Sequence, residues 1–204
     1  TFMLRPIYLQ PGDKVALISP SGVATKEQLD AACSLLTSWE LEPVPGQHVL
    51  SRHGRLAGTD EERLHDLQTA LDAEDIRAIW CMAGDYGMLR IVQEADYSIF
   101  QGNPKWVIGM NDITVLHSKL HSLGIESLHA FMPSDYNTTS PEVVTQLRNF
   151  LFGIISSYAI PAHPFNRPGI VETEMIGGML QWVHNLHDTC IERNTKGTNL
   201  FIQD

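Results

Sequence analysis

The feature that most constrains this chain is a strand pattern that changes directly into a helix pattern within residues 105–117. Residues 106–108 form a short apolar run with high strand propensity, and Gly109 interrupts it. From Asp112 onward the apolar residues recur at helical spacing. A strand, a sharp turn and a helix in this order lift the residue at the bend, Asn111, clear of the sheet. The first amides of the helix then point toward whatever is held there.

The same alternation extends over the first 152 residues. Strands are expected at 14–19, 41–44, 76–82, 106–108 and 125–129, and helices at 25–39, 59–71, 112–123 and 141–152, with a short helix after residue 87. Thr25 is a candidate helix cap, and Thr59 with Glu62 matches a capping box. Alternation at this spacing predicts an α/β fold, a doubly wound and mostly parallel sheet of the Rossmann-like or flavodoxin-like type.

The composition changes after this region. Residues 154–168 hold three prolines and no helical period, which predicts a linker. We therefore expect an N-terminal domain at 1–153 and the incomplete start of a smaller second domain at 169–204. There, Gly177 and Gly178 are expected to open a helix, and residues 199–202 to form a strand in which the chain stops.

Charge and cysteine content limit the partners. The formal net charge is −10, and no basic run is longer than a pair, which argues against nucleic acid and anionic membranes. A small cationic or zwitterionic ligand remains compatible with this charge. No apolar run reaches the roughly 18 residues of a membrane span, and the first residues lack a secretion signal. Three scattered cysteines fit a reducing cytoplasm, where we expect the protein to lie.

Several stretches, in this order along the chain, resemble one family. They are Pro-Gly-Asp-Lys-Val-Ala-Leu-Ile-Ser-Pro-Ser-Gly at 11–22, Gly-Asp-Tyr-Gly-Met-Leu-Arg at 84–90, Pro-Lys-Trp-Val-Ile-Gly-Met-Asn-Asp-Ile-Thr-Val-Leu-His at 104–117, Gly-Gly at 177–178 and Leu-Phe-Ile-Gln-Asp at 200–204. Together they resemble the LD-carboxypeptidase family of serine peptidases, which includes the murein tetrapeptide carboxypeptidases and the microcin C immunity peptidases. The resemblance covers nearly the whole chain, although its single glycine motifs are weak signals by themselves.

This resemblance implies a cytoplasmic hydrolase of peptidoglycan recycling that removes a terminal D-amino acid from murein peptides. It implies a serine at the elbow, a glutamate and a histidine from the second domain, no cofactor, and a tendency to dimerise. The expected histidine would lie beyond Asp204, so the chain resembles a diverged and C-terminally truncated member.

The departures from the family concentrate at the catalytic positions. Asn111 stands at the serine position and Gln203 at the glutamate position, while Asp112 matches the residue whose backbone amide helps to form the oxyanion hole. The glycine loop, with Gly84, Asp85 and Tyr86, is expected to bind ligand, and Asp85 is equally compatible with a solvated loop carboxylate. Further substitutions are Ala83 for an arginine, Asp85 for a glycine and Met179 for an asparagine.

Several other residues have both a purely structural and a functional interpretation. Asn111 either contacts a ligand or only stabilises the turn. Cys81 is a substitute nucleophile or an inert buried thiol. His117, His121 and His129 have a spacing that can bind zinc, but no further ligand completes the set, so we expect no metal. His184, His187 and Asp188 fit a polar helix face, Trp80 and Trp106 the core, and Trp182 a contact between the domains.

Two functions are compatible with these residues. One is a serine-type carboxypeptidase acting on murein peptides, which the family implies and which the substitutions impair. The other is a non-catalytic relative that keeps the cleft to bind a peptide or a partner subunit.

Overall fold

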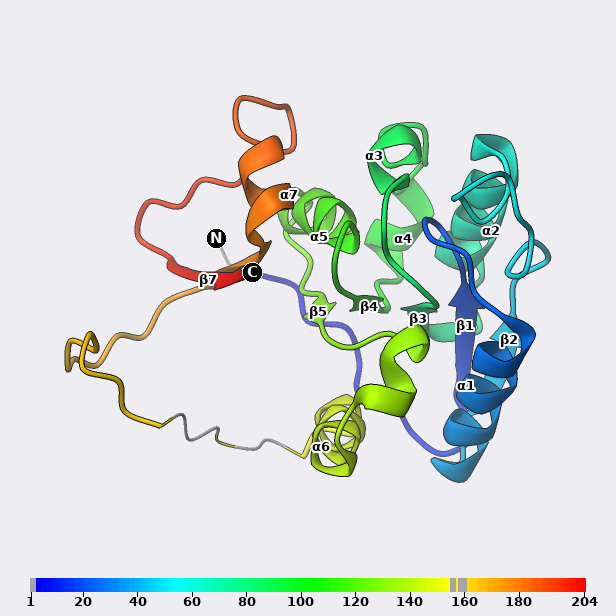
Figure 1. Cartoon of the computed structure of the whole chain (residues 1–204), viewed down its shortest axis with the longest axis horizontal. Coiled ribbons are helices and arrows are strands. Elements are labelled where there is room, and N and C mark those ends of the chain that lie inside the picture. Colours follow the sequence, from blue (N-terminus) through cyan, green and yellow to red (C-terminus); the bar gives the residue numbers. More distant parts are fainter. Residues whose placement is uncertain (1–2, 155–156, 158–160) are drawn as a thin grey trace.

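The computed structural model describes residues 3–154, 157 and 161–204. Five strands form one sheet in the order β2-β1-β3-β4-β5, and all four pairings are parallel (Figure 1). Their bounds are β1 (Lys14–Ile18), β2 (Glu42–Pro45), β3 (Ile76–Cys81), β4 (Trp106–Gly109) and β5 (Leu128–His129). The predicted α/β class with a mostly parallel sheet is confirmed, and the strand order is that of the flavodoxin-like arrangement.

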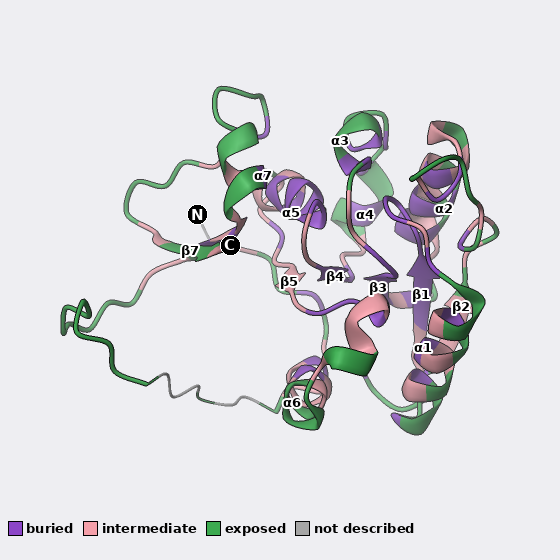
Figure 2. Ribbon diagram, in the orientation of Figure 1, coloured by how far each residue is buried: buried purple, intermediate pink, exposed green. Residues whose placement is uncertain are grey.

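Helices cover both faces of this sheet (Figure 1). They are α1 (Lys26–Ser38), α2 (Asp60–Asp72), α3 (Met88–Ile91), α4 (Ser98–Gly102), α5 (Ile113–Ser122) and α6 (Pro141–Leu151), with a 3₁₀ helix η1 (Pro133–Thr138) before α6. Side chains of α2, α3 and α5 pack into the apolar core on one face, and those of α1 and α6 into a second core on the other. The central strands β1, β3 and β4 are largely buried between these two layers, whereas the edge strands β2 and β5 are not (Figure 2).

Local sequence determines where the two long helices of the first half begin. Thr25 caps α1 and Thr59 caps α2, each in a complete capping box with the side chain three residues later. Both caps were predicted from the sequence. The strand tryptophans are core residues as expected, since Trp80 and Trp106 are 1% and 0% exposed.

A second, two-stranded parallel sheet joins β6 (Met175–Met179) and β7 (Asn199–Gln203), and α7 (Leu180–Asn185) follows β6 directly. Gly177 and Gly178 lie inside β6, so the prediction that they open a helix is wrong; the helix begins at Leu180. Their φ angles of +148° and +149° explain the glycines. A side chain at either position would also collide, with the Phe201 backbone or with Thr114.

The last strand of the main sheet is shorter than expected. It covers only Leu128–His129, because Ile125 pairs instead with Leu4 of the N-terminal segment. Residues 161–172 are exposed and contain no helix or strand (Figure 2), while residues 155, 156 and 158–160 of the expected linker lie outside the described part. No helix within the described ranges is long and apolar enough to cross a membrane.

Candidate active site

The strand-turn-helix unit forms the elbow that its sequence predicts. β4 ends at Gly109, α5 begins at Ile113, and between them Asn111 has a φ of +60°. Asparagine enters this left-handed region more readily than most residues. The amides of Ile113 and Thr114 donate to carbonyls three residues back. Within the described residues the Asp112 amide has no such acceptor, and Asp112 as a whole is 0% exposed.

The Asn111 side chain is held from the second sheet region. Its Oδ1 accepts a hydrogen bond from Nε1 of Trp182 on α7, at 3.2 Å. Trp182 is 4% exposed and belongs to the same apolar core as α5, and its ring lies 6.2 Å from that of Tyr86 between centroids. The elbow side chain, the glycine loop and α7 therefore meet at one place.

Asp112 is fully buried, and its carboxylate organises the loops around the elbow. It accepts hydrogen bonds from Ser21 Oγ at 2.6 Å, from the Asp85 amide at 3.1 Å and from the Met88 amide at 3.0 Å. Burial raises the pKa of this carboxyl group above its usual value, and the three hydrogen bonds oppose that shift. The side chain has a structural role that the sequence did not predict, since its three partners lie 24 to 91 residues away.

The glycine loop packs directly against the elbow. A Cβ atom at Gly84 would lie 2.8 Å from Asn111 Cβ, so only glycine allows this approach. Beside it is a cavity of about 390 Å³, lined by Gly22 and Val23 after β1, by Arg52, Gly54 and Arg55, and by Ala83, Gly84 and Asp85. Residues after β1 and β3 meet here because the strand order reverses between these strands, which is where open parallel sheets bind ligands.

Charges of both signs border this cavity. Asp85 pairs with Arg55, whose Nη2 lies 2.9 Å and 3.1 Å from its two carboxylate oxygens. Arg52 also lines the cavity and is exposed. The structure thus brings Gly84 and Asp85 to the cavity, while Tyr86 lies against Trp182.

Gln203 contacts a histidine rather than the elbow. Its Oε1 lies 2.6 Å from Nε2 of His129, whose pKa is lowered mainly by burial. His129 lies on β5, which pairs with β4, and its partner residue on β4 is Gly109. A second cavity, of about 800 Å³, lies beside it between β5, α6 and β6. The pairing of His129 with Gln203 has no local sequence signal, because 74 residues separate them.

Comparison with known proteins identifies the family to which this chain belongs. A sequence profile of the LD-carboxypeptidase N-terminal domain matches residues 15–130, which include the glycine loop and the elbow. This chain belongs to the LD-carboxypeptidase family. A Bacillus subtilis protein named "Probable murein peptide carboxypeptidase" is 31% identical over 206 residues, covering 98% of this chain and 65% of that protein. The chain therefore spans less than two thirds of this relative's length.

Solved structures agree on the fold. The muramoyltetrapeptide carboxypeptidase from Oxalobacter formigenes superposes with a TM-score of 0.81 at 24% identity, over 93% of this chain and 65% of that chain. The structure of MccF in complex with glutamyl sulfamoyl guanosine gives a TM-score of 0.80 at 19% identity, over 97% and 70%. At these identities the likeness shows the LD-carboxypeptidase fold.

Other candidate nucleophiles of this LD-carboxypeptidase-family chain are shielded. Cys81 is fully buried, and burial raises the pKa of its thiol well above the usual range, so the reactive thiolate is disfavoured. Ser21 is equally buried, and its hydroxyl group donates a hydrogen bond to the Asp112 carboxylate. Among the described residues, no histidine ring forms a hydrogen bond with Ser21 or Asn111.

The three histidines at zinc-binding spacing each have separate partners. His117 contacts Ser127 Oγ and the Gly109 carbonyl through its two ring nitrogens, at 2.8 and 2.9 Å. His121 contacts Glu174 at 2.9 Å, and His129 contacts Gln203. The nitrogens that make these contacts are thus directed to different protein groups rather than to one common point. His184 lies on α7, but His187 and Asp188 follow the end of that helix, so the prediction that the three share one helix face is wrong; His187 and Asp188 form an exposed group with Glu192.

Proposed function

We propose that this member of the LD-carboxypeptidase family binds a small murein-type peptide at the elbow and does not form an acyl-enzyme. The observation that carries the proposal is the identity of the residue at the bend. A serine peptidase needs a hydroxyl there, with a base to remove its proton. Asn111 presents a carboxamide instead, and its oxygen accepts a hydrogen bond from Trp182.

The position of Gln203 supports the loss of catalysis. In the family this position holds the glutamate that orients and stabilises the catalytic histidine. A neutral amide stabilises an imidazolium ion much less than a carboxylate does, as the same change in a triad aspartate illustrates. Restoring a serine alone is therefore not expected to restore turnover.

The cavity supports a zwitterionic ligand. Asp85 offers a carboxylate to an ammonium group, while Arg52 and Arg55 offer guanidinium groups to a terminal carboxylate. From the family resemblance we also propose the backbone amide of Asp112 as the donor to a peptide carbonyl. The Bacillus subtilis relative is named a probable murein peptide carboxypeptidase, and MccF was solved in complex with glutamyl sulfamoyl guanosine, which supports a small ligand.

Hydrolysis and binding of an L,D-tetrapeptide test this proposal together. We expect release of the terminal D-amino acid to stay at the rate in buffer for the natural chain. The Asn111→Ser/Gln203→Glu double variant should behave alike, because no histidine ring among the described residues forms a hydrogen bond with position 111 and could act as its base. Calorimetry should detect binding that weakens about tenfold in Asp85→Asn, since a charged contact is removed. Asp188→Asn, on the exposed group near α7, serves as the control and should bind as the natural chain does.

Turnover by the natural chain clearly above buffer would overturn the catalytic part of the proposal. Absence of binding would overturn the ligand part. From the family resemblance we further propose that the protein acts in the cytoplasm and forms a homodimer. Analytical ultracentrifugation at two protein concentrations measures its oligomeric state.

A further inference from the structure

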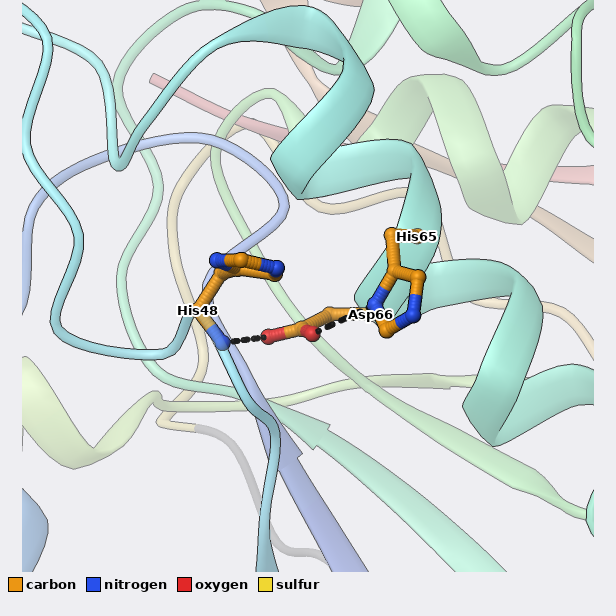
Figure 3. Close-up of side chains that lie close together, drawn as sticks. All are labelled: His48, His65 and Asp66. Carbon is orange, nitrogen blue, oxygen red and sulfur yellow. Dashed lines mark hydrogen bonds and ion pairs between the residues drawn. The ribbon is translucent and has the colours of Figure 1, made fainter.

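A second group of polar side chains lies away from the elbow, where the loop after β2 meets α2. It consists of His48 on the loop and the adjacent His65 and Asp66 on the helix. Figure 3 shows the Asp66 carboxylate between the backbone nitrogen of His48 and the imidazole ring of His65, with the His48 ring beside it. One ligand atom from each of the three side chains lies within 4.8 Å of those of the other two.

The distances are close to those of a tetrahedral metal site. His65 Nδ1 is 3.3 Å from Asp66 Oδ1. For metal bonds of about 2.0–2.1 Å, two ligands of a tetrahedral zinc ion are separated by about 3.3 Å, so this pair already has the required spacing. The His48 ring stands 5.3 Å from the His65 ring between centroids, and it lies on a turn. A modest rotation of that side chain completes the group.

Asp66 is an unusual carboxylate. It is only 4% exposed, and within the described residues no lysine or arginine pairs with it. Its hydrogen bonds come from the His48 amide, at 2.8 Å, and from the His65 ring. A buried carboxylate without a positive side chain is costly, and a divalent cation supplies the missing charge.

The surroundings also fit a metal. Glu62 Oε1 lies 3.5 Å from His48 Nδ1, the carboxylate-to-histidine contact that orients metal-bound imidazoles and leaves the other ring nitrogen for the ion. The His65 side chain is 52% exposed, which gives an ion access from solvent and leaves room for a water as fourth ligand.

We propose that His48, His65 and Asp66 form a binding site for one zinc-type divalent ion. Two imidazoles and one carboxylate favour zinc or cobalt over magnesium or calcium. The ion joins the β2–α2 loop to α2. Because that loop also carries Arg52 and Arg55, the metal fixes the wall of the 390 Å³ cavity. This inference does not depend on the proposed function.

Zinc binding to the metal-free protein tests the site directly. Titration against a chromophoric chelator should show one zinc ion per chain, and cobalt should give the absorption of a tetrahedral complex. His65→Ala should weaken zinc binding at least tenfold. This variant is expected to fold, because position 65 is a partly exposed helix position and alanine favours helices. His48→Ala should cause a similar loss, and circular dichroism should confirm that both variants are folded.

His187→Ala is the matched control, since it removes a histidine from the exposed group with Asp188 and Glu192. Its zinc affinity should stay within twofold of that of the natural chain. The proposal is overturned if the natural chain binds no zinc, if folded His65→Ala and His48→Ala bind as tightly as the natural chain, or if only His187→Ala loses the ion.

Discussion

Asp112 illustrates how much one buried side chain determines at this site. Its carboxylate accepts hydrogen bonds from the Ser21 hydroxyl after β1 and from the backbone amides of Asp85 and Met88 after β3. The neighbouring Asn111 occupies the bend itself and accepts a hydrogen bond from α7. The conformation of the elbow therefore depends on Asp112, whereas the chemistry that the elbow can perform depends on Asn111.

Replacing Asp112 by alanine should destabilise the fold. Three donors would lose their acceptor in a buried place, which we expect to lower the free energy of unfolding by about 2–4 kcal/mol. Urea denaturation measures this. Asp30→Ala removes an exposed carboxylate that pairs with Lys26 and should change the free energy by less than about 0.5 kcal/mol. Equal stability of the two variants would contradict the role of Asp112.

His117 gives a prediction for pH. Burial lowers the pKa of its ring from 6.5 to about 3, so the folded protein keeps it neutral while the unfolded chain protonates it below pH 6.5. The unfolded state then binds more protons, and stability is complete above pH 6.5 and falls as the pH drops toward 3. The contribution of this group is about 1.4 kcal/mol per pH unit. His117→Gln should show a shallower loss of stability over this range, and an unchanged slope would refute the assignment.

Contacts between distant residues explain what the sequence could not predict at this scale. The elbow, with Asn111 at its bend, follows from a local pattern of strand, glycine and helix. The contacts of Asn111 with Trp182 and of Gln203 with His129 join residues 71 and 74 positions apart, so no local pattern reports them. The same holds for the metal-ligand group, in which His48 is 18 residues from Asp66.

Among the helices and strands, Lys105 shows how one element stabilises the end of another. Placed just before β4, it is 1% exposed, and its ammonium group donates to the carbonyls of Ala70, Leu71 and Ala73. These carbonyls belong to the last turn of α2 and its cap, where a helix leaves acceptors without partners. Burial lowers the pKa of Lys105 to about 8, so the group remains mostly charged at pH 7.

Lys105→Met should therefore weaken the fold through the end of α2. We expect the free energy of unfolding to fall by about 2–4 kcal/mol, because charged hydrogen bonds to three carbonyls are lost. Hydrogen exchange should also increase in the last turn of α2. Lys26→Met, at an exposed position, is the control and should leave both measurements nearly unchanged. Loss of stability without faster exchange in α2 would place the effect elsewhere.

Element boundaries were predictable where capping residues mark them. Thr25 and Thr59 begin α1 and α2 as their sequences indicate. Gly177 and Gly178 were misinterpreted because a glycine pair is compatible with a turn, whereas here it allows β6 to pass close to Phe201 and Thr114. The sequence also did not indicate α4, a single turn at Ser98–Gly102.

At the scale of the whole molecule, the segment between α6 and β6 is the place where we expect proteases to cut first. Residues 161–172 are exposed and contain no helix or strand, and Phe165 lies among them. We therefore propose the domain boundary here, at residues 154–168. Limited chymotrypsin digestion followed by mass spectrometry should find the first cleavage after Phe165, which is 87% exposed. A first cleavage between β1 and α6 would argue against this boundary.

The central claim concerns the whole active site: the LD-carboxypeptidase scaffold is present, but the elbow holds no group that can accept an acyl chain. Incubation with a fluorophosphonate that labels activated serines, followed by intact-mass measurement and peptide mapping, tests this most directly. A known serine hydrolase in the same mixture verifies the reagent. The account predicts no adduct on this chain, and an adduct mapped to Ser21 or to any other residue beside the elbow would contradict it.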